Sequence, residues 1–152
     1  MFDAERAAIL RLASSCEPAA GARRTLIKRL PGMEDSSRDW SVFMTLEHLR
    51  IVNGVVGESI LGLSEGIVPE RVASTAAVKP SPEVDAGAID AFDRGCDRFQ
   101  GIVAAIPDLR TLARYAHPWF GPLDAAGWHA MVTFHLRLHR KQVEAILAAM
   151  RR

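Results

Sequence analysis

The C-terminal part of the sequence contains two histidines at a spacing that suits metal binding. His135 and His139 lie four residues apart, among leucines, in the stretch TFHLRLHRKQ. In a helix, a four-residue step leaves two side chains only about 40° apart around the axis, so both imidazoles point to one side. Two imidazoles in this arrangement can chelate one ion from a single helix.

A third histidine, His48, belongs to another apolar helical face. It follows Met44 by four residues and precedes Ile51 by three, so helical spacing turns it toward the core. A lone buried histidine is more often a core residue than a ligand, but three together are harder to satisfy. Each unmatched ring nitrogen costs about 1 to 3 kcal/mol. A shared divalent ion would satisfy three nitrogens at once, and we therefore predict a metal site at His48, His135 and His139.

Gln142 and Glu47 are weaker candidates for a catalytic role. Gln142 follows His139 by three residues on the same face, where it could orient a metal ligand or a bound water. A polar residue at the end of a helix bundle is an equal alternative. Glu47 precedes His48 but is turned about 100° away from it around the helix, which favours a charge on the helix flank over a general base.

His117 lies in the segment AHPWFG, between two stretches with helical periodicity. Trp119 and Phe120 are expected to anchor this loop by burial. His117 could contact a substrate as an acid or a base, but a structural role in the loop is favoured. The same holds for Tyr115.

Two classes of metalloenzyme are excluded by the same residues. Zinc proteases of the His-Glu-x-x-His type carry a glutamate directly after the first histidine, whereas Leu136 follows His135 here. Di-iron bundles need paired Glu-x-x-His motifs, which this sequence lacks.

Four segments with apolar residues at helical spacing must position these side chains. Ser41 and Asp124 are expected to be N-caps, because their side-chain oxygens can accept hydrogen bonds from free backbone amides. No stretch shows the alternation typical of a strand. The sequence therefore predicts a single domain over residues 1–152, with an all-α, four-helix bundle fold. The expected helices run from about Asp3 to Leu30 with a bend at Pro18, from Ser41 to Leu61, from Pro82 to Ile106 and from Asp124 to Met150.

The composition is that of a globular protein, with 49% hydrophobic and 24% charged residues. The formal net charge is +1, so no global field recruits nucleic acid or an anionic membrane. One local basic cluster is interpreted as the solvated face of a helix: Arg23, Arg24, Lys28 and Arg29.

No apolar run approaches the length of about 20 residues that a membrane span requires. The N-terminal residues MFDAERAAIL include acids where a signal peptide would be basic. We therefore expect a cytoplasmic protein without membrane partners. Cys16 and Cys96 fall on apolar helical stripes, and we expect both to be buried thiols that act as small hydrophobes.

Several of these residues resemble a known family. Trp40 and His48 in WSVFMTLEH, with His135, His139 and Gln142 in HLRLHRKQ, resemble the DinB/YfiT-like superfamily of metalloenzymes. The longer segment HPWFGPLDAAGWHAMVTFHLRLHRKQ is similar to a bacterial branch of that superfamily.

The resemblance implies a four-helix bundle with a divalent ion, zinc or nickel, held by the positions of His48, His135 and His139. Known members include transferases and isomerases that use low-molecular-weight thiols. A small-molecule substrate, such a thiol and a homodimer are what the resemblance implies for partners.

Two classes of function stay open at this point. The first is a metal-dependent thiol transferase or hydrolase that activates water or a thiol against a small electrophile. The second is a non-catalytic, metal-stabilised bundle that acts as a stress-related binding or sensor protein. An open coordination position reached by a pocket would favour the enzyme, whereas a metal sealed by side chains would favour the sensor.

Overall fold

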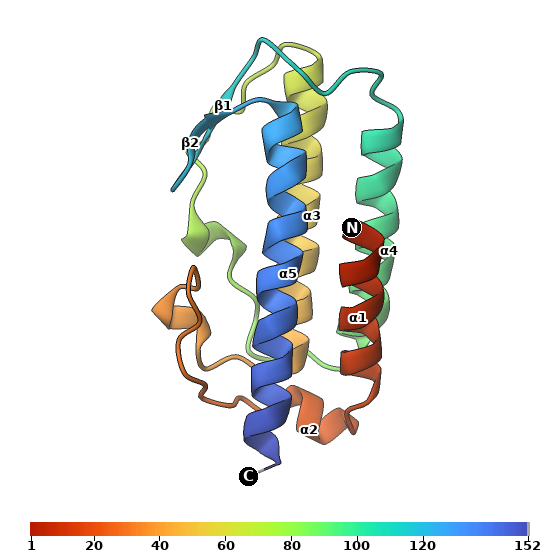
Figure 1. Ribbon diagram of the computed structural model, residues 1–152, viewed down its shortest axis with the longest axis vertical. Coiled ribbons are helices and arrows are strands. Elements are labelled where there is room, and N and C mark those ends of the chain that lie inside the picture. Colours follow the sequence, from red (N-terminus) through yellow and green to blue (C-terminus); the bar gives the residue numbers. More distant parts are fainter. Residues whose placement is uncertain (152) are drawn as a thin grey trace.

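The computed structural model describes residues 1–151, and helices make up most of its regular structure. The helices α1 (Phe2–Ser14), α3 (Val42–Ser64), α4 (Gly87–Ala104) and α5 (Ala125–Met150) lie along one common axis (Figure 1). In Figure 1, α1 and α5 run downward and α3 and α4 run upward. Both α3 and α1 contact α4 and α5, which closes a bundle of four helices. The predicted four-helix bundle is confirmed.

Both predicted N-caps are confirmed. The side chain of Ser41 accepts a hydrogen bond from the backbone N–H of Met44 at the start of α3. The side chain of Asp124 does the same for Gly127 at the start of α5. Each cap satisfies one of the backbone donors that the first turn of a helix leaves free. These two helices carry the three histidines, so their starting points set the register of the candidate site.

The prediction of one long first helix is wrong. α1 ends at Ser14, and the chain then forms only a short helix, α2 (Pro18–Ala22). Proline fits the first turn of a new helix, where its missing N–H costs nothing. Beyond α2 the chain is extended: the N–H of Ile27 donates to the carbonyl of Arg38. The basic cluster therefore lies at the end of α2 and on an extended segment, and not on a helix face.

Strands occur where none was predicted. β1 (Tyr115–His117) and β2 (Gly121–Leu123) form an antiparallel hairpin in which His117 pairs with Gly121. Gly121 has a φ of 71°, a left-handed conformation that favours glycine. The expected anchoring by Trp119 and Phe120 is also wrong, because these side chains are 57% and 65% exposed.

The hairpin is held by the residues before and after it. The hydroxyl of Tyr115 donates to the carbonyl of Arg71, and the indole N–H of Trp128 donates to the carbonyl of Tyr115. The rings of Tyr115 and Trp128 stack with centroids 5.4 Å apart. These contacts fix the hairpin to α5 and to the connection between α3 and α4.

Residues 65–86 form that connection and cross one side of the bundle. The segment includes the short helix η2 (Thr75–Val78), which contacts α3. A second short helix, η1 (Asp35–Ser37), precedes α3. In Figure 1, the hairpin, η2 and η1 all lie on the left side of α5. The bundle is thus covered by non-helical chain on one side, and the candidate site lies beneath this cover.

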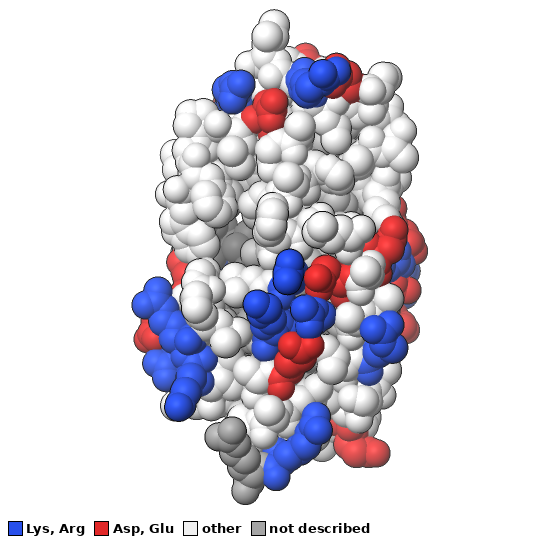
Figure 2. All heavy atoms as spheres, in the orientation of Figure 1, with Lys and Arg blue, Asp and Glu red and all other residues white. Residues whose placement is uncertain are grey.

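The surface is unevenly charged on the face drawn in Figure 2. Charged side chains gather over the lower half, whereas most of the upper half is free of them apart from a group at the top edge.

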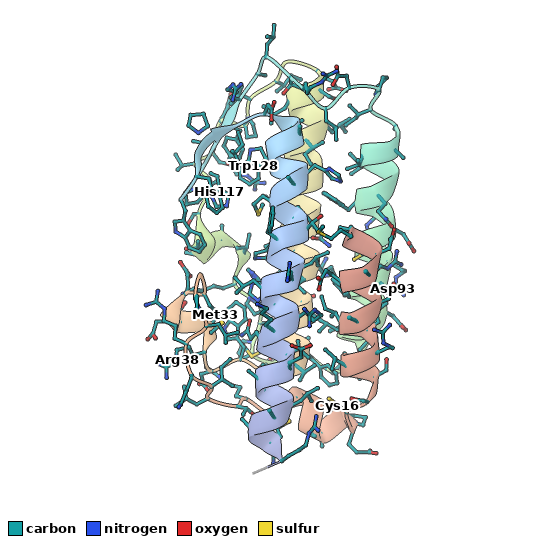
Figure 3. All side chains as sticks on the ribbon, in the orientation of Figure 1. Cys16, Met33, Arg38, Asp93, His117 and Trp128 are labelled. Atoms are coloured by element: carbon teal, nitrogen blue, oxygen red, sulfur yellow. The ribbon has the colours of Figure 1, made fainter. Side chains whose placement is uncertain are left out.

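None of the described helices combines the length and the apolar character that crossing a membrane needs. Cys96 is buried as predicted, but Cys16, near α2 in Figure 3, is partly exposed.

Candidate metal centre

Three imidazoles from two helices meet inside the bundle. His48 comes from α3, and His135 and His139 come from α5. The Nε2 atom of His135 lies 3.1 Å from Nε2 of His48 and 3.0 Å from Nε2 of His139. In a tetrahedral zinc site with bonds of about 2.0 to 2.1 Å, ligand nitrogens lie roughly 3.3 to 3.4 Å apart. The cluster therefore has nearly the spacing that a shared ion needs.

Hydrogen bonds fix the tautomers of two of these rings. Nδ1 of His48 lies 2.7 Å from the carbonyl oxygen of Val78 in η2. A carbonyl can only accept, so Nδ1 carries the proton and donates it. Nε2 of His48 is left with a free lone pair, which lies against Nε2 of His135.

His139 is fixed in the same way by Gln142. Its Nδ1–H donates to Oε1 of Gln142 across 2.6 Å. The amide of Gln142 is itself oriented, because its Nε2 donates to the carbonyl of Ser37 in η1 across 2.7 Å. Gln142 is fully buried. Of the two roles considered for Gln142, the contacts correspond to the one in which it orients a histidine of the cluster.

The contacts of His135 differ from those of the other two rings. Its Nδ1 is buried and has no hydrogen-bond partner within residues 1–151. A proton on its Nε2 could serve only one of the two lone pairs that His48 and His139 direct at it. Protons alone therefore do not satisfy the three Nε2 atoms, whereas one cation does. The residues present fit a divalent ion.

Burial lowers the pKa of all three imidazoles. For His139 it lowers the pKa to about 3, aided by the nearby His48 and opposed by the hydrogen bond to Gln142. Burial also sets the pKa of His135 well below its usual value, and His139, His48 and His117 lower it further. The pKa of His48 is lowered by burial and raised in part by its bond to Val78. All three rings are neutral near pH 7, the form in which imidazole binds a metal ion.

Trp40, part of the motif noted in the sequence, covers the cluster. Its ring centroid lies 5.0 Å from that of His48 and 6.3 Å from that of His139. The indole is 7% exposed. It packs against both rings and restricts their rotation, which keeps the Nε2 atoms directed at one point.

The candidates Glu47 and His117 lie outside the cluster, and so does a further histidine, His129. Glu47 forms an ion pair with Arg50, at 2.7 Å. His129, also on α5, stacks on Phe99 with centroids 6.1 Å apart. His117 lies close to Trp128, with centroids 5.2 Å apart, in the space between the hairpin and α5 (Figure 3).

A cavity of about 160 Å³ lies beside the three histidines, and all three line it. Its wall comes from α3, α5, the connection 65–86 and the hairpin, so His117 also lines it. A more open groove of about 590 Å³ adjoins the cavity and shares Glu34, Lys79 and Trp119 with it. The cluster can therefore be reached from the surface. The sequence patterns did not reveal this cavity, because it depends on contacts between distant segments.

Comparisons with known proteins agree with the fold. A family model described as the DinB superfamily matches residues 1–143. Among solved structures, TT2238, described as a four-helix bundle protein, has a TM-score of 0.66 and 22% sequence identity, over 95% of this chain and 93% of that chain. At that identity the likeness shows the fold alone. No protein with a curated description matches the chain.

Proposed function

The chain belongs to the DinB superfamily, and from this membership and its three convergent imidazoles we propose that it is a metal-dependent enzyme. The proposed reaction uses activated water or a low-molecular-weight thiol to attack a small electrophile, as a hydrolase or a thiol transferase would. His48, His135 and His139 would hold the ion through their Nε2 atoms. Zinc or nickel suits this donor set.

The ion would supply the nucleophile. Held by His48, His135 and His139 as neutral imidazoles, a divalent ion would keep its double charge and would lower the pKa of a bound water toward about 7, or hold a thiol as its thiolate. The protein's own contribution is to hold two of the three rings in one tautomer and orientation. Val78 and Gln142 do this for His48 and His139, and Trp40 excludes water from one side of the rings.

The single observation that carries the proposal is the cavity. It reaches all three histidines and adjoins a groove open to the surface. A metal that only stapled the bundle or served as a sensor input would need no such space. Within the described residues, no further His, Cys, Asp or Glu side chain joins the three histidines as a ligand. This supports a coordination position that is open to substrate.

Metal content tests the proposal. Purified wild-type protein is expected to bind one equivalent of zinc or nickel, measured by elemental analysis after dialysis. His135→Ala and His48→Ala should each lose most of it. His129→Ala is a matched control, because His129 is on the same helix as His135 but outside the cluster. Equal metal content in the wild type and both ligand variants would refute the site.

The enzyme assignment needs a second measurement on the same proteins. Metal-loaded wild type is incubated with a low-molecular-weight thiol and a panel of small electrophiles, and thiol consumption is followed. We expect turnover that disappears in His135→Ala and persists in His129→Ala. Tight metal binding without turnover or hydrolysis across the panel would favour the non-catalytic bundle.

A further inference from the structure

The cavity beside the histidines has a mainly apolar wall. The buried side chains of Val52, Val56 and Trp128 line it, and Met131 and Leu138 also contribute. Its volume is about 160 Å³. A cavity of about 150 Å³ lined by aliphatic and aromatic side chains accepts benzene. The space therefore suits a compact apolar group of that size.

Several polar groups of this wall are committed to partners within the protein. The hydroxyl of Tyr115 donates to the carbonyl of Arg71, and the indole N–H of Trp128 donates to the carbonyl of Tyr115. The hydroxyl of Ser59 donates to the carbonyl of Val55. These three donors are not available to a ligand. A ligand that packs against these side chains would leave its own polar atoms unsatisfied unless it were mostly apolar.

His117 is different, because its ring keeps one donor for a ligand. The backbone N–H of Trp119 donates to Nδ1 of His117 across 3.1 Å. Nδ1 is therefore the acceptor, and the proton of the neutral ring is on Nε2. Nε2 of His117 has no hydrogen-bond partner within the described part of the chain, and the side chain lines the cavity.

Aromatic contacts hold the His117 ring in place. Its centroid lies 4.7 Å from that of Phe120 and 5.2 Å from that of Trp128. The ring is also anchored through its backbone, since His117 pairs with Gly121 in the hairpin. A donor whose ring is already fixed loses little entropy when it binds a ligand.

We infer that the cavity binds a small, mainly apolar ligand, about the size of a substituted benzene, and that the Nε2–H of His117 donates to its one hydrogen-bond acceptor. The reactive end of this ligand lies beside His48, His135 and His139. The inference rests on the proposed function and narrows its substrate class to compact apolar electrophiles or thiols that carry a carbonyl or similar acceptor. His117 is then a residue that determines specificity.

Binding of matched thiol probes tests this inference. The protein is loaded with cobalt(II) under anaerobic conditions, because the visible spectrum of cobalt reports a thiol that binds beside the histidines. Three probes are titrated: phenylmethanethiol, 2-mercaptoethanol, and 1-phenyl-2-sulfanylethanone, which adds one carbonyl. Phenylmethanethiol should bind at least tenfold more tightly than 2-mercaptoethanol, because its ring is transferred from water to an apolar wall.

The carbonyl probe then isolates the role of His117. The affinity ratio of the carbonyl thiol to phenylmethanethiol should fall about two- to tenfold in His117→Phe, the range for one lost hydrogen bond. His117→Gln retains a donor and should restore part of the ratio. His129→Phe is the matched control, because His129 is similarly half-buried but does not line the cavity, and it should leave the ratio unchanged.

Two results would overturn the inference while the proposed function survives. One is equal affinity for phenylmethanethiol and 2-mercaptoethanol in cobalt-loaded wild type. The other is an affinity ratio of the carbonyl thiol to phenylmethanethiol that falls as much in His129→Phe as in His117→Phe. A protein whose cobalt spectrum does not depend on the three histidines overturns the proposed function and this inference together.

Discussion

Replacing Gln142 with leucine should weaken metal binding although Gln142 is not expected to touch the ion. The substitution removes the acceptor for Nδ1–H of His139 and the donor for the carbonyl of Ser37. Both groups are buried, so each lost partner costs roughly 1 to 3 kcal/mol of folding free energy. Loss of such a contact behind a ligating histidine lowers metal affinity about 10- to 100-fold, which corresponds to about 1.4 to 2.7 kcal/mol.

The assay is a competition titration of zinc between the protein and a chromophoric chelator, with folding checked by circular dichroism. Gln142→Glu separates the two contacts, because a carboxylate still accepts from His139 but cannot donate to Ser37. It should retain most of the zinc affinity and lose stability. Asn53→Leu is the control for a buried amide outside the cluster, where Asn53 donates to Cys96. A folded Gln142→Leu protein with zinc affinity within twofold of wild type would refute the reasoning.

Three further predictions concern the fold. The pKa of His139 is about 3 in the folded protein and about 6.5 in an unfolded chain. Between these two pH values the unfolded state therefore binds more protons than the folded state. The metal-free protein should keep its full stability above about pH 6.5 and lose stability as the pH falls toward 3. A urea midpoint that does not change between pH 7.5 and 5.5 would contradict this. Asp124→Ala removes the bond to the N–H of Gly127 and should cost about 1 kcal/mol in urea unfolding, whereas an unchanged midpoint would show that the cap is dispensable. Gly21→Ala would place a Cβ in steric overlap with Cζ of Phe43 and should destabilise the protein by about 1 to 3 kcal/mol; a more stable variant would show that the ring can move freely.

The histidine cluster could be predicted because it depends on local periodicity. A four-residue step on one helix fixes the relation between His135 and His139 whatever the rest of the chain does. Predicting that His48 joins the cluster required only the further assumption that its apolar neighbours face the same core. Ser41 and Asp124 were predictable for the same reason, since a cap acts within its own first turn.

The end of the first helix could not be predicted, because its cause lies elsewhere in the chain. Residues 23–30 have apolar spacing compatible with a helix, but their backbone bonds to the segment before α3 instead, as in the pair Ile27 and Arg38. The absence of a side chain at Gly21 lets the ring of Phe43 approach the backbone of α2. Neither contact leaves a periodic signal in the sequence.

The hairpin and the cavity were missed for related reasons. Strands of three residues, such as Tyr115–His117, are too short to show the alternation by which a strand is recognised. Aromatic residues suggested that the loop was anchored by Trp119 and Phe120, whereas Tyr115 is the buried anchor. The wall of the cavity joins segments that are distant in the sequence; Tyr115, for example, bonds to Arg71, which is 44 positions away.

The role of Gln142 shows where the sequence leaves two interpretations open. Its place on the face of His139 followed from spacing, but spacing alone could not tell a partner of the histidine from a polar residue at the bundle end. The carbonyl of Ser37 in η1 orients the amide. That contact joins residues 105 positions apart.

The central claim is that three Nε2 atoms bind one cation while Nδ1 of His48 and His139 stays protonated. Long-range proton–nitrogen NMR of the histidine rings, recorded before and after adding one equivalent of zinc, measures this directly. The account predicts that the Nε2 resonances of His48, His135 and His139 all shift to metal-bound values, that the Nδ1–H signals of His48 and His139 persist, and that His117 and His129 change little. Coordination through Nδ1, or through fewer than three of these rings, would contradict it.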